Sequence, residues 1–305
     1  MASVKVTLEE LAQEYLFDCQ ARKLSPRTIE GYKKLLSLFQ KHVREAEFIT
    51  TLDELTPQVI KRYIVHLQRA GKKPQYINDI IKVIKTFSKY AHEEGYTKDV
   101  LTEKVRNVHQ PKVKIASFNE KEVSRMLSYF CHRNFLDVRN KALLALFFDT
   151  GIRCDEALSM LPEQNMGDYL IIHGKGDKER VVPISAPLGR LLIKYSSMRT
   201  QYFKDKKIEP YFFLSKTGRK LTDEAVCTFM KEAAREVGVR EIVRVSPHTC
   251  RHTFAHMQLE NGCDLFTLSR LLGHSSLSIT QRYLEGIEDA TILRKGVKTS
   301  PLNNI

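Results

Sequence analysis

Apolar side chains recur every three or four residues along residues 7–95, which is the spacing of one face of an α-helix. Hydroxyl residues stand directly before proline at two places in this region. Helices commonly start at such pairs, because the hydroxyl caps free amide groups and proline fits the first turn. These signals predict four helices, which begin near residues 7, 25, 56 and 74. We therefore expect a small all-α domain over residues 1–95.

The pattern changes after this region. Residues 96–116 are polar and basic and contain a proline, which is typical of an interdomain linker. Asn119 and Glu122 then have the spacing of a capping box, and residues 138–148 are nearly all apolar, which predicts a buried helix. Two short strand-like runs, at 169–173 and 180–184, flank a glycine-containing segment and predict a β-hairpin.

The fold class we expect is mainly α with a small β-sheet. The helical domain at 1–95 and the linker at 96–116 are followed by a mixed α+β domain at 117–286. A tail at 287–305 has little pattern of its own.

Charge points to the class of partner. The chain carries 49 lysines and arginines against 36 acidic residues, a formal net charge of +13. Such an excess favours a polyanion, and nucleic acid is the expected one. No run of eighteen apolar residues occurs, and the N-terminus lacks the charged-then-apolar pattern of a secretory signal. We expect a bacterial cytoplasmic protein that is associated with the nucleoid and not with a membrane.

The six cysteines are scattered along the chain and form no Cys-x-x-Cys pair. They are Cys19, Cys131, Cys154, Cys227, Cys250 and Cys263. We expect reduced, mostly buried thiols, and neither a disulfide framework nor a zinc ribbon.

Residues 246–285 hold chemically versatile side chains at helical spacing. A Ser-Pro pair opens a predicted helix in which His248 and Arg251 lie three residues apart, so both share one face. A Leu-Gly-His sequence ends a further helix and leaves His274 at a turn. Serine caps then predict a last short helix that presents Tyr283 one or two turns in.

A second such stretch lies upstream, where Thr-Gly-Ile-Arg-x-x-Glu-x-Leu spans residues 150–158. Arg153 stands at the start of a predicted helix, beside free amides and the positive end of the helix dipole, which also attract phosphate. Glu156 follows three residues later and is placed to hold the guanidinium. Taken alone, the two would be interpreted as an ordinary helix ion pair.

Together these motifs resemble the two conserved boxes of the tyrosine recombinases, the phage-integrase and Xer-like family. His-x-x-Arg, Leu-Gly-His and a tyrosine nine residues later match the second box, and residues 150–158 match the first. The segment Leu24–Tyr32 is similar to the family's core-binding domain. The hairpin, with Gly174-Lys175-Gly176 at its tip, resembles the one that carries the family's lysine into the minor groove. The resemblance implies a two-domain DNA clamp.

The resemblance also implies catalytic roles. Tyr283 attacks a DNA phosphodiester and leaves a 3′-phosphotyrosine and a free 5′-hydroxyl. Arg153 and Arg251 donate paired hydrogen bonds to the nonbridging oxygens, a geometry that lysine cannot reproduce. Lys175 protonates the departing 5′ oxygen.

The remaining roles fall to two histidines and a carboxylate. His248 accepts the tyrosine proton or orients the phosphate, and His274 donates a further hydrogen bond to the phosphate. Glu156 supports Arg153, with Asp155 as a less favoured substitute. The phosphotyrosine conserves the energy of the broken bond, so no metal, cofactor or ATP is expected.

Basic side chains in both domains are candidate DNA contacts, because lysine and arginine bind phosphate whatever the base sequence. They are Arg27, Lys33, Lys34, Lys72, Lys73, Lys82, Lys85, Lys178 and Arg180. The implied partners are double-stranded recombination sites, a homotetramer on synapsed DNA, and accessory DNA-bending or directionality proteins. The tail at 287–305 is a candidate for docking on a neighbouring subunit.

Other interpretations stay open at this point. His248, His252 and His256 recur every four residues and could form a metal site, but no glutamate follows the first histidine and Arg251 would lie beside the metal. We interpret His252 and His256 as structural residues instead. A type IB topoisomerase uses a similar residue set, and a non-catalytic DNA-binding regulator could share the fold. As the biological role we favour the integrase or transposase of a mobile element, with Xer-type resolution of chromosome dimers as the alternative.

Overall fold

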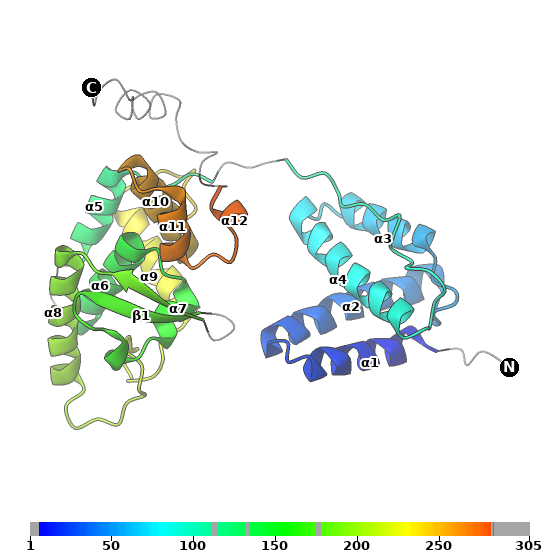
Figure 1. Cartoon of the computed structure of the whole chain (residues 1–305), viewed down its shortest axis with the longest axis horizontal. Coiled ribbons are helices and arrows are strands. Elements are labelled where there is room, and N and C mark those ends of the chain that lie inside the picture. Colours follow the sequence, from blue (N-terminus) through cyan, green and yellow to red (C-terminus); the bar gives the residue numbers. More distant parts are fainter. Residues whose placement is uncertain (1–5, 112–114, 132–133, 175–177, 282, 284–305) are drawn as a thin grey trace, which may run out of the picture. The chain divides into compact units, whose positions relative to one another are not determined.

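The computed structural model describes residues 6–111, 115–131, 134–174, 178–281 and 283. The chain divides into two compact units, Met1–Lys112 and Val113–Ile305 (Figure 1). Within the described part of the chain, no helix combines the length and the apolar character needed to cross a membrane.

Four helices form the described part of the first unit. They are α1 (Leu8–Ala21), α2 (Pro26–Glu47), α3 (Pro57–Arg69) and α4 (Pro74–Glu93). All four start where the sequence predicts. In three of them the hydroxyl groups of Thr7, Ser25 and Thr56 each accept an amide N–H of the first turn. The predicted helices are therefore confirmed, and their apolar faces enclose one core around Tyr15 and Phe39.

The chain beyond α4 stays attached to this first unit for longer than a linker at 96–116 would. Val105 is buried in the core of the unit. The side-chain amide of Asn78, on α4, donates to the carbonyl oxygen of Val108 (3.0 Å) and accepts from its amide (2.8 Å). The boundary between the two units falls at Lys112.

The second unit holds all the remaining elements. They are α5 (Glu120–Tyr129), α6 (Phe135–Thr150), α7 (Cys154–Ser159), the 3₁₀ helix η1 (Pro162–Gln164), β1 (Tyr169–Gly174), β2 (Lys178–Pro183), α8 (Ala186–Tyr202), α9 (Asp223–Glu236), α10 (Pro247–Glu260), α11 (Leu265–Leu272) and α12 (Leu277–Gln281). The fold is mainly α with a small sheet, as predicted.

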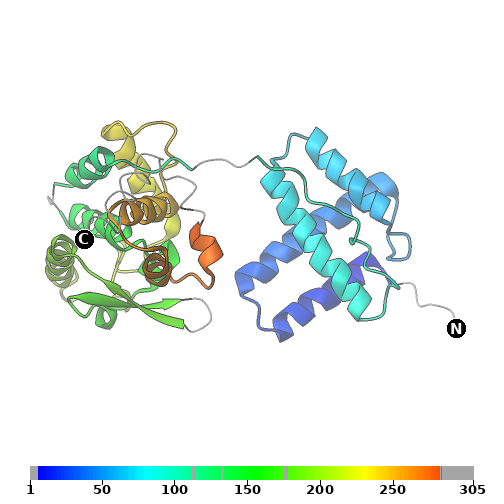
Figure 2. The same cartoon turned by 45° about the horizontal axis from the view of Figure 1, so that its top comes forward.

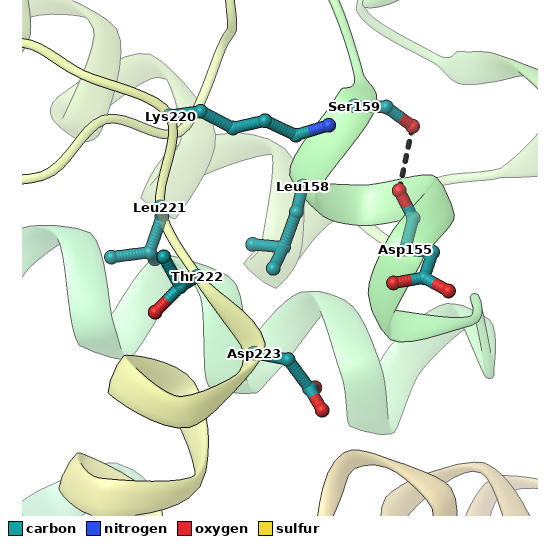
Figure 3. Close-up of a pocket in the computed structure, with 7 residues that line it drawn as sticks. All are labelled: Asp155, Leu158, Ser159, Lys220, Leu221, Thr222 and Asp223. Carbon is teal, nitrogen blue, oxygen red and sulfur yellow. Dashed lines mark hydrogen bonds between the residues drawn. The ribbon is translucent and has the colours of Figure 1, made fainter. Parts of the chain in front are cut away.

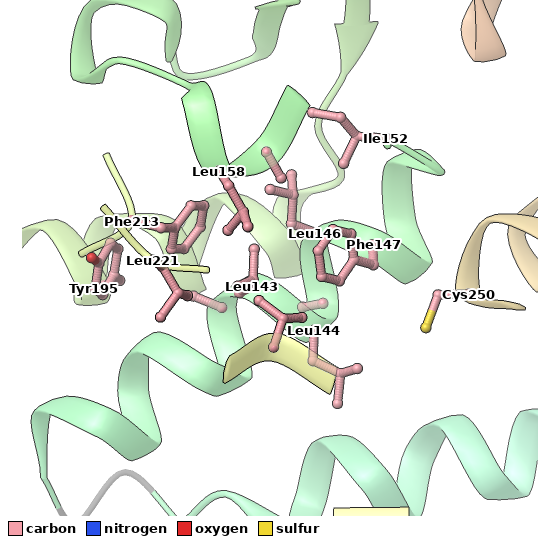
Figure 4. Packing of buried hydrophobic residues seen from close by; sticks show 14 of the residues in the cluster. Leu143, Leu144, Leu146, Phe147, Ile152, Leu158, Tyr195, Phe213, Leu221 and Cys250 are labelled. Atoms are coloured by element: carbon pink, nitrogen blue, oxygen red, sulfur yellow. The ribbon is translucent and has the colours of Figure 1, made fainter. Parts of the chain in front are cut away.

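The core of the second unit is built on α6. Leu143, Leu144, Leu146 and Phe147 are fully buried in it (Figure 4), and α6 packs against α8 and α10. The predicted buried helix is thus confirmed, although it begins earlier, at Phe135, and ends later, at Thr150. It contains one buried cation, Arg139. That guanidinium is satisfied by Asn140 Oδ1 and by the carbonyl oxygen of Leu214.

The sheet of the described residues is one antiparallel hairpin, whose register runs from Tyr169 opposite Pro183 to Gly174 opposite Lys178. Leu170, Ile172 and Val182 are buried, while Val181 is 59% exposed, so the strands alternate as a half-buried sheet does. In sequence the two strands are joined by residues 175–177, which lie outside the described residues. Helix α11 packs against β2 (Figure 2).

The expectation that the cysteines are mostly buried is wrong. All six are free, but only Cys19 and Cys250 are buried. Cys131 is exposed, and Cys154, Cys227 and Cys263 are half-buried. Cys131 and Cys263 lie in the segments that follow α5 and α10, where the chain leaves the core.

Candidate active site

Helix α10 presents the first pair of predicted site residues. Ser246 Oγ accepts the amide of Thr249 (3.2 Å) and so caps the helix as expected. One turn in, His248 is exposed and Arg251 is buried, at 4% exposure. The two therefore share a helix face but meet different surroundings.

Backbone carbonyls hold the buried Arg251 in place. Its Nη1 donates to the carbonyl oxygen of Gly151 (2.7 Å), and its Nη2 donates to that of Leu272 (2.6 Å). Burial lowers the pKa of Arg251 to about 10, and the cation of Arg153 adds to this effect. The guanidinium is still charged at neutral pH, so the site contains a fixed, largely dehydrated cation.

The C-terminus of α11 gathers three arginines. The carbonyl oxygens of Leu271, Leu272 and Gly273 accept from Arg180 Nε (3.0 Å), Arg251 Nη2 (2.6 Å) and Arg153 Nη2 (3.5 Å), respectively. Free carbonyls and the negative end of the helix dipole both favour cations at this position. These three guanidiniums come from β2, α10 and the N-cap of α7.

Glu156 joins two of these arginines. Its Oε1 accepts from Arg153 Nη1 (2.9 Å) and Arg180 Nη1 (2.9 Å), and its Oε2 accepts from Arg180 Nη2 (2.7 Å) and the Arg153 amide (2.9 Å). Burial alone would raise the pKa of this carboxyl, but the bonds from Arg180 and Arg153 hold it at about 2. Glu156 is therefore ionised and lies against Arg153, as the sequence predicted.

His274 lies at the turn after α11, where its two ring nitrogens have different partners. Nε2 is 3.0 Å from Arg251 Nη2 and Nδ1 is 2.8 Å from Thr280 Oγ1. Arginine only donates, so Nε2 accepts and the proton lies on Nδ1. Burial and the neighbouring arginines lower the pKa of His274 to about 4.

Tyr283 packs among histidines. Its ring stacks on that of His274 (centroids 6.2 Å apart) and meets His252 and His256 edge-on, at 4.9 and 6.0 Å. The side chain is only 5% exposed. The sequence predicted Tyr283 inside the last helix, and this is wrong: α12 ends at Gln281, and the tyrosine follows it in a turn.

His248 and Lys175 are the two remaining predicted catalytic residues. The ring of His248 contacts that of His252, with the centroids 4.6 Å apart, and His252 in turn contacts the ring of Tyr283. Lys175 lies outside the described residues.

Two family models match the sequence. The model for the "Phage integrase family" matches residues 116–288, more than half of the chain, and the model for the "Phage integrase, N-terminal SAM-like domain" matches residues 12–95. The chain belongs to the phage integrase family.

Relatives of this integrase-family protein agree along nearly the whole chain. Tyrosine recombinase XerD of Oceanobacillus iheyensis is 30% identical over 269 residues, which are 86% of this chain and 88% of that protein. XerH site-specific recombinase bound to palindromic difH substrate, a post-cleavage complex, gives a TM-score of 0.74 at 19% identity, with 96% of this chain and 85% of that chain covered. A lambda integrase tetramer bound to a Holliday junction gives 0.74 at 16%, with 94% and 80% covered.

The protein is therefore a site-specific DNA recombinase of the tyrosine-recombinase type. The predicted layout of a helical N-terminal domain followed by a catalytic domain is confirmed. These matches favour the recombinase over the topoisomerase and the regulator.

The sequence analysis underestimated the contacts that three residues make around the site: His252, His256 and Arg180. His252 and His256, interpreted as structural, line the ring of Tyr283, and burial lowers the pKa of both, that of His252 to about 4. Among the described residues, no group of three His, Cys, Asp or Glu side chains is placed to hold a metal ion. Arg180, expected to contact DNA, is instead bound to Glu156, and its side chain is only 11% exposed. The sequence shows that His252 and His256 are four residues apart and that Arg180 follows Lys178 by two. It does not show which groups His252, His256 and Arg180 contact.

Asp155, the substitute for Glu156, lies elsewhere. It lines a depression of about 390 Å³ together with α7 and the segment before α9 (Figure 3). The other lining residues are Leu158, Ser159, Lys220, Leu221, Thr222 and Asp223. The contacts of Arg153 thus favour Glu156 as its support.

Most candidate DNA contacts of the first unit are open to solvent. Lys85 is half-buried, with its Nζ 3.4 Å from Asn107 Oδ1. The exposed ones are Arg27, Lys33 and Lys34 on α2, Lys72 and Lys73 before α4, and Lys82 on α4. Lys178 opens β2.

Proposed function

We propose that this recombinase cuts and rejoins DNA through Tyr283. The tyrosine oxygen attacks the phosphorus, the bond to the 5′ oxygen breaks, and a 3′-phosphotyrosine and a 5′-hydroxyl result. The observation that carries the proposal is the position of the Tyr283 ring against His274, whose Nε2 accepts from the buried Arg251. We expect a phosphate bound by Arg251 and His274 to lie close to Tyr283, the nucleophile.

Arg153 and Arg251 stabilise the charge that builds up on the nonbridging oxygens. Arg251 is a preorganised cation, because carbonyls already fix it. Arg153 is 44% exposed and held by Glu156, so part of its guanidinium is accessible to a phosphate. Removing one such donor typically costs about 10²–10³ in rate.

Proton transfers fall to the remaining residues. His248 accepts the proton of Tyr283 or orients the phosphate, and Lys175 protonates the leaving 5′ oxygen. His274 cannot donate from Nε2 while that atom accepts from Arg251. A phosphate anion beside the ring raises its pKa from about 4. The ring then takes up a proton and becomes the expected donor.

The reaction needs no ATP, metal or cofactor, because the phosphotyrosine keeps the bond energy and the arginines supply the positive charge. A second DNA end attacks the phosphotyrosine and reverses the chemistry on a new partner.

Complete exchange requires four subunits on two double-stranded sites, and the fold similarity to the lambda integrase tetramer supports this assembly. We propose that the helical domain, with its exposed lysines, and the catalytic domain clamp the DNA. The domains are taken as 1–95 and 117–286, joined by residues 96–116, of which Val105 and Val108 pack on the first unit. The tail at 287–305 docks on a neighbouring subunit, and accessory DNA-bending or directionality proteins assist. The protein acts in the bacterial cytoplasm on the nucleoid.

Two biological roles fit this chemistry. The first is the integrase or transposase of a mobile element. The second is Xer-type resolution of chromosome dimers, and the observation that favours it is the 30% identity to a XerD protein along 88% of that protein's length. Covalent complexes formed on DNA from the ends of a neighbouring element support the first, and complexes formed on DNA from the chromosome's replication terminus support the second.

The chemistry is tested with nicked duplex DNA carrying the site, incubated with protein in EDTA. A covalent protein–DNA band on a denaturing gel is expected for the wild type and for Tyr169→Phe, which changes an exposed tyrosine on β1. The band is expected to disappear in Tyr283→Phe. A band that survives Tyr283→Phe would refute the nucleophile. DNA binding without any band would refute the proposed cleavage.

A further inference from the structure

We propose that Arg180 is a positioning residue for the cleavage step, which orients Glu156 so that Glu156 in turn fixes the guanidinium of Arg153. The inference rests on the proposed function, because Arg153 matters only if the site binds a phosphate. It replaces the DNA contact expected for Arg180 from its place in a basic hairpin.

All three nitrogens of the Arg180 guanidinium have partners within the protein. Nη1 and Nη2 form a forked pair with the Oε1 and Oε2 atoms of Glu156, at 2.9 and 2.7 Å, and Nε donates to the carbonyl oxygen of Leu271 at 3.0 Å. A planar fork fixes a carboxylate in direction as well as in position. Arg180 therefore ties β2 to α7 and to the end of α11.

Glu156 transmits this constraint to Arg153. Each of its carboxylate oxygens binds both arginines, so the plane that Arg180 sets is also the plane that receives Arg153 Nη1 and the Arg153 amide. The Glu156 side chain is 7% exposed and that of Arg153 is 44% exposed. Glu156 thus joins the nearly buried Arg180 to the more accessible Arg153.

The turn after α11 is shaped to admit Arg180. Gly273 has a positive φ of 64°, and a Cβ atom there would lie 2.8 Å from Cδ of Arg180 and 3.1 Å from its Nε and Nη1. The backbone therefore packs directly on the Arg180 side chain, and His274 follows in the next position. Displacing Arg180 would disturb both the carboxylate and this turn.

Four variants test the chain of contacts: Arg180→Gln, Arg180→Lys, Glu156→Gln and the double variant Glu156→Gln/Arg180→Gln. Single-turnover cleavage of nicked DNA is measured beside equilibrium binding at several salt concentrations. Arg235→Gln is the matched control, since Arg235 forms an exposed pair with Glu236 on α9.

The expected result is specific to a residue that acts through Glu156. Arg180→Gln lowers the cleavage rate by about 10–100-fold, because a displacement of about 1 Å in a catalytic group can cost about 10²-fold. Arg180→Lys, which keeps the charge but not the fork, recovers part of that loss. In the Glu156→Gln background the same change adds less than about threefold, since effects through a shared partner do not add. Binding and its salt dependence stay at wild-type values, as does Arg235→Gln throughout.

Other outcomes would overturn the inference. The inference is refuted if Arg180→Gln cleaves at the wild-type rate. It is also refuted if the fold-losses in cleavage rate of Arg180→Gln and Glu156→Gln multiply in the double variant. A salt slope reduced by about 1 would make Arg180 a phosphate contact. Should Arg180→Gln fail to fold, the double variant, which lacks the unpaired buried carboxylate, must cleave like Glu156→Gln. A wild-type protein without a Tyr283-dependent band refutes the proposed function itself, and the inference falls with it.

Discussion

The two units of the chain treat charge in opposite ways. Among the described residues of the first unit no charged side chain is buried, and its ion pairs lie at the surface, as Arg62–Glu47 does with exposures of 55% and 17%. The second unit buries Arg251, and its Arg180–Glu156 pair is only 11% and 7% exposed. The described part of the first unit keeps its cations at the surface, whereas the second unit also holds cations in its interior against carbonyl oxygens.

This difference shows that charged groups contribute differently to the two units. Exposed pairs contribute only about 0–1 kcal/mol each, so ion pairs add little to the stability of the first unit, whose helices pack around an apolar core. Buried charges are costly unless every hydrogen bond is made, and a carboxylate and three helix-end carbonyls meet this need in the second unit. The buried charges at the site are therefore held by specific partners, and the substitutions below compare a residue of the second unit with a matched one in the first unit.

The largest effect is expected for Arg251→Lys, set against Arg62→Lys. Lysine cannot reach both Gly151 and Leu272 while still presenting a fork to phosphate. Cleavage of nicked DNA should fall by about 10²–10³ with binding retained. Arg62→Lys, which alters an exposed forked pair, should leave the cleavage rate unchanged. Equal losses of cleavage rate in the two variants would contradict the proposed difference between the units.

Next comes stability, with Glu122→Gln set against Glu47→Gln. Glu122 is fully buried at the capping box of α5 and accepts three bonds from Arg240 and one from the Asn119 amide. The change should cost about 2–3 kcal/mol in urea unfolding. Glu47→Gln should cost at most about 1 kcal/mol. Far-UV circular dichroism is the suitable signal, since the chain has no tryptophan.

The pH dependence sharpens this comparison. The forked bond from Arg240 lowers the pKa of Glu122 from 4.5 to about 2 in the folded chain. A depressed carboxyl pKa stabilises the fold above the unfolded value and loses this effect as pH falls toward the folded value. The difference between wild type and Glu122→Gln should be constant from pH 5 to pH 8 and should shrink between about pH 4.5 and about pH 2. A difference that grew on acidification would contradict the assignment.

A smaller effect is expected for Gly273→Ala, set against Gly71→Ala. Both glycines have a positive φ, at 64° and 68°, but a Cβ at Gly71 meets nothing within 4 Å, whereas one at Gly273 strikes Arg180. Both changes should cost about 1–2 kcal/mol of stability from backbone strain. Only Gly273→Ala should also slow cleavage, by about tenfold, as a small displacement of the site would. Normal cleavage in Gly273→Ala would show that the turn tolerates movement of Arg180.

The smallest effect is expected for Thr280→Val, set against Thr86→Val. Thr280 Oγ1 accepts the Nδ1 proton of His274, and Thr86 Oγ1 accepts the hydroxyl proton of Tyr15 in the first unit. Each loss should cost about 0.5–1.5 kcal/mol. In Thr280→Val this should appear as a two- to tenfold slower cleavage at about 0.5–1.5 kcal/mol, and in Thr86→Val as lower stability alone. The single-turnover assay and urea unfolding separate the two.

Local signals anticipated most of the secondary structure. Ser25, Thr56, Asn119 and Ser246 each cap the helix that the sequence placed after them, because a cap depends only on the next three residues. The end of the last helix was predicted wrongly, so Tyr283 was placed inside that helix and not in the turn after it. The serines before this helix indicate where it starts, but the sequence holds no comparable stop signal before Tyr283.

Contacts between elements distant in sequence were beyond such reasoning. Lys178 and Arg180 lie two residues apart on one strand, and nothing in their spacing shows that Arg180 pairs with Glu156. Likewise His252 and His256 look like ordinary helix positions until Tyr283 packs on them.

The sequence by itself determined which segments are helical, which faces are apolar, and the spacing of the two boxes that hold Arg153, Arg251, His274 and Tyr283. These features follow from interactions within a few residues of one another. Only the tertiary structure decided that guanidiniums from α7, β2 and α10 meet at the last carbonyls of α11. Arg153 and Gly273 are 120 positions apart in the chain, and only the packing of the hairpin, α7 and α10 around a common core brings such groups within hydrogen-bonding distance.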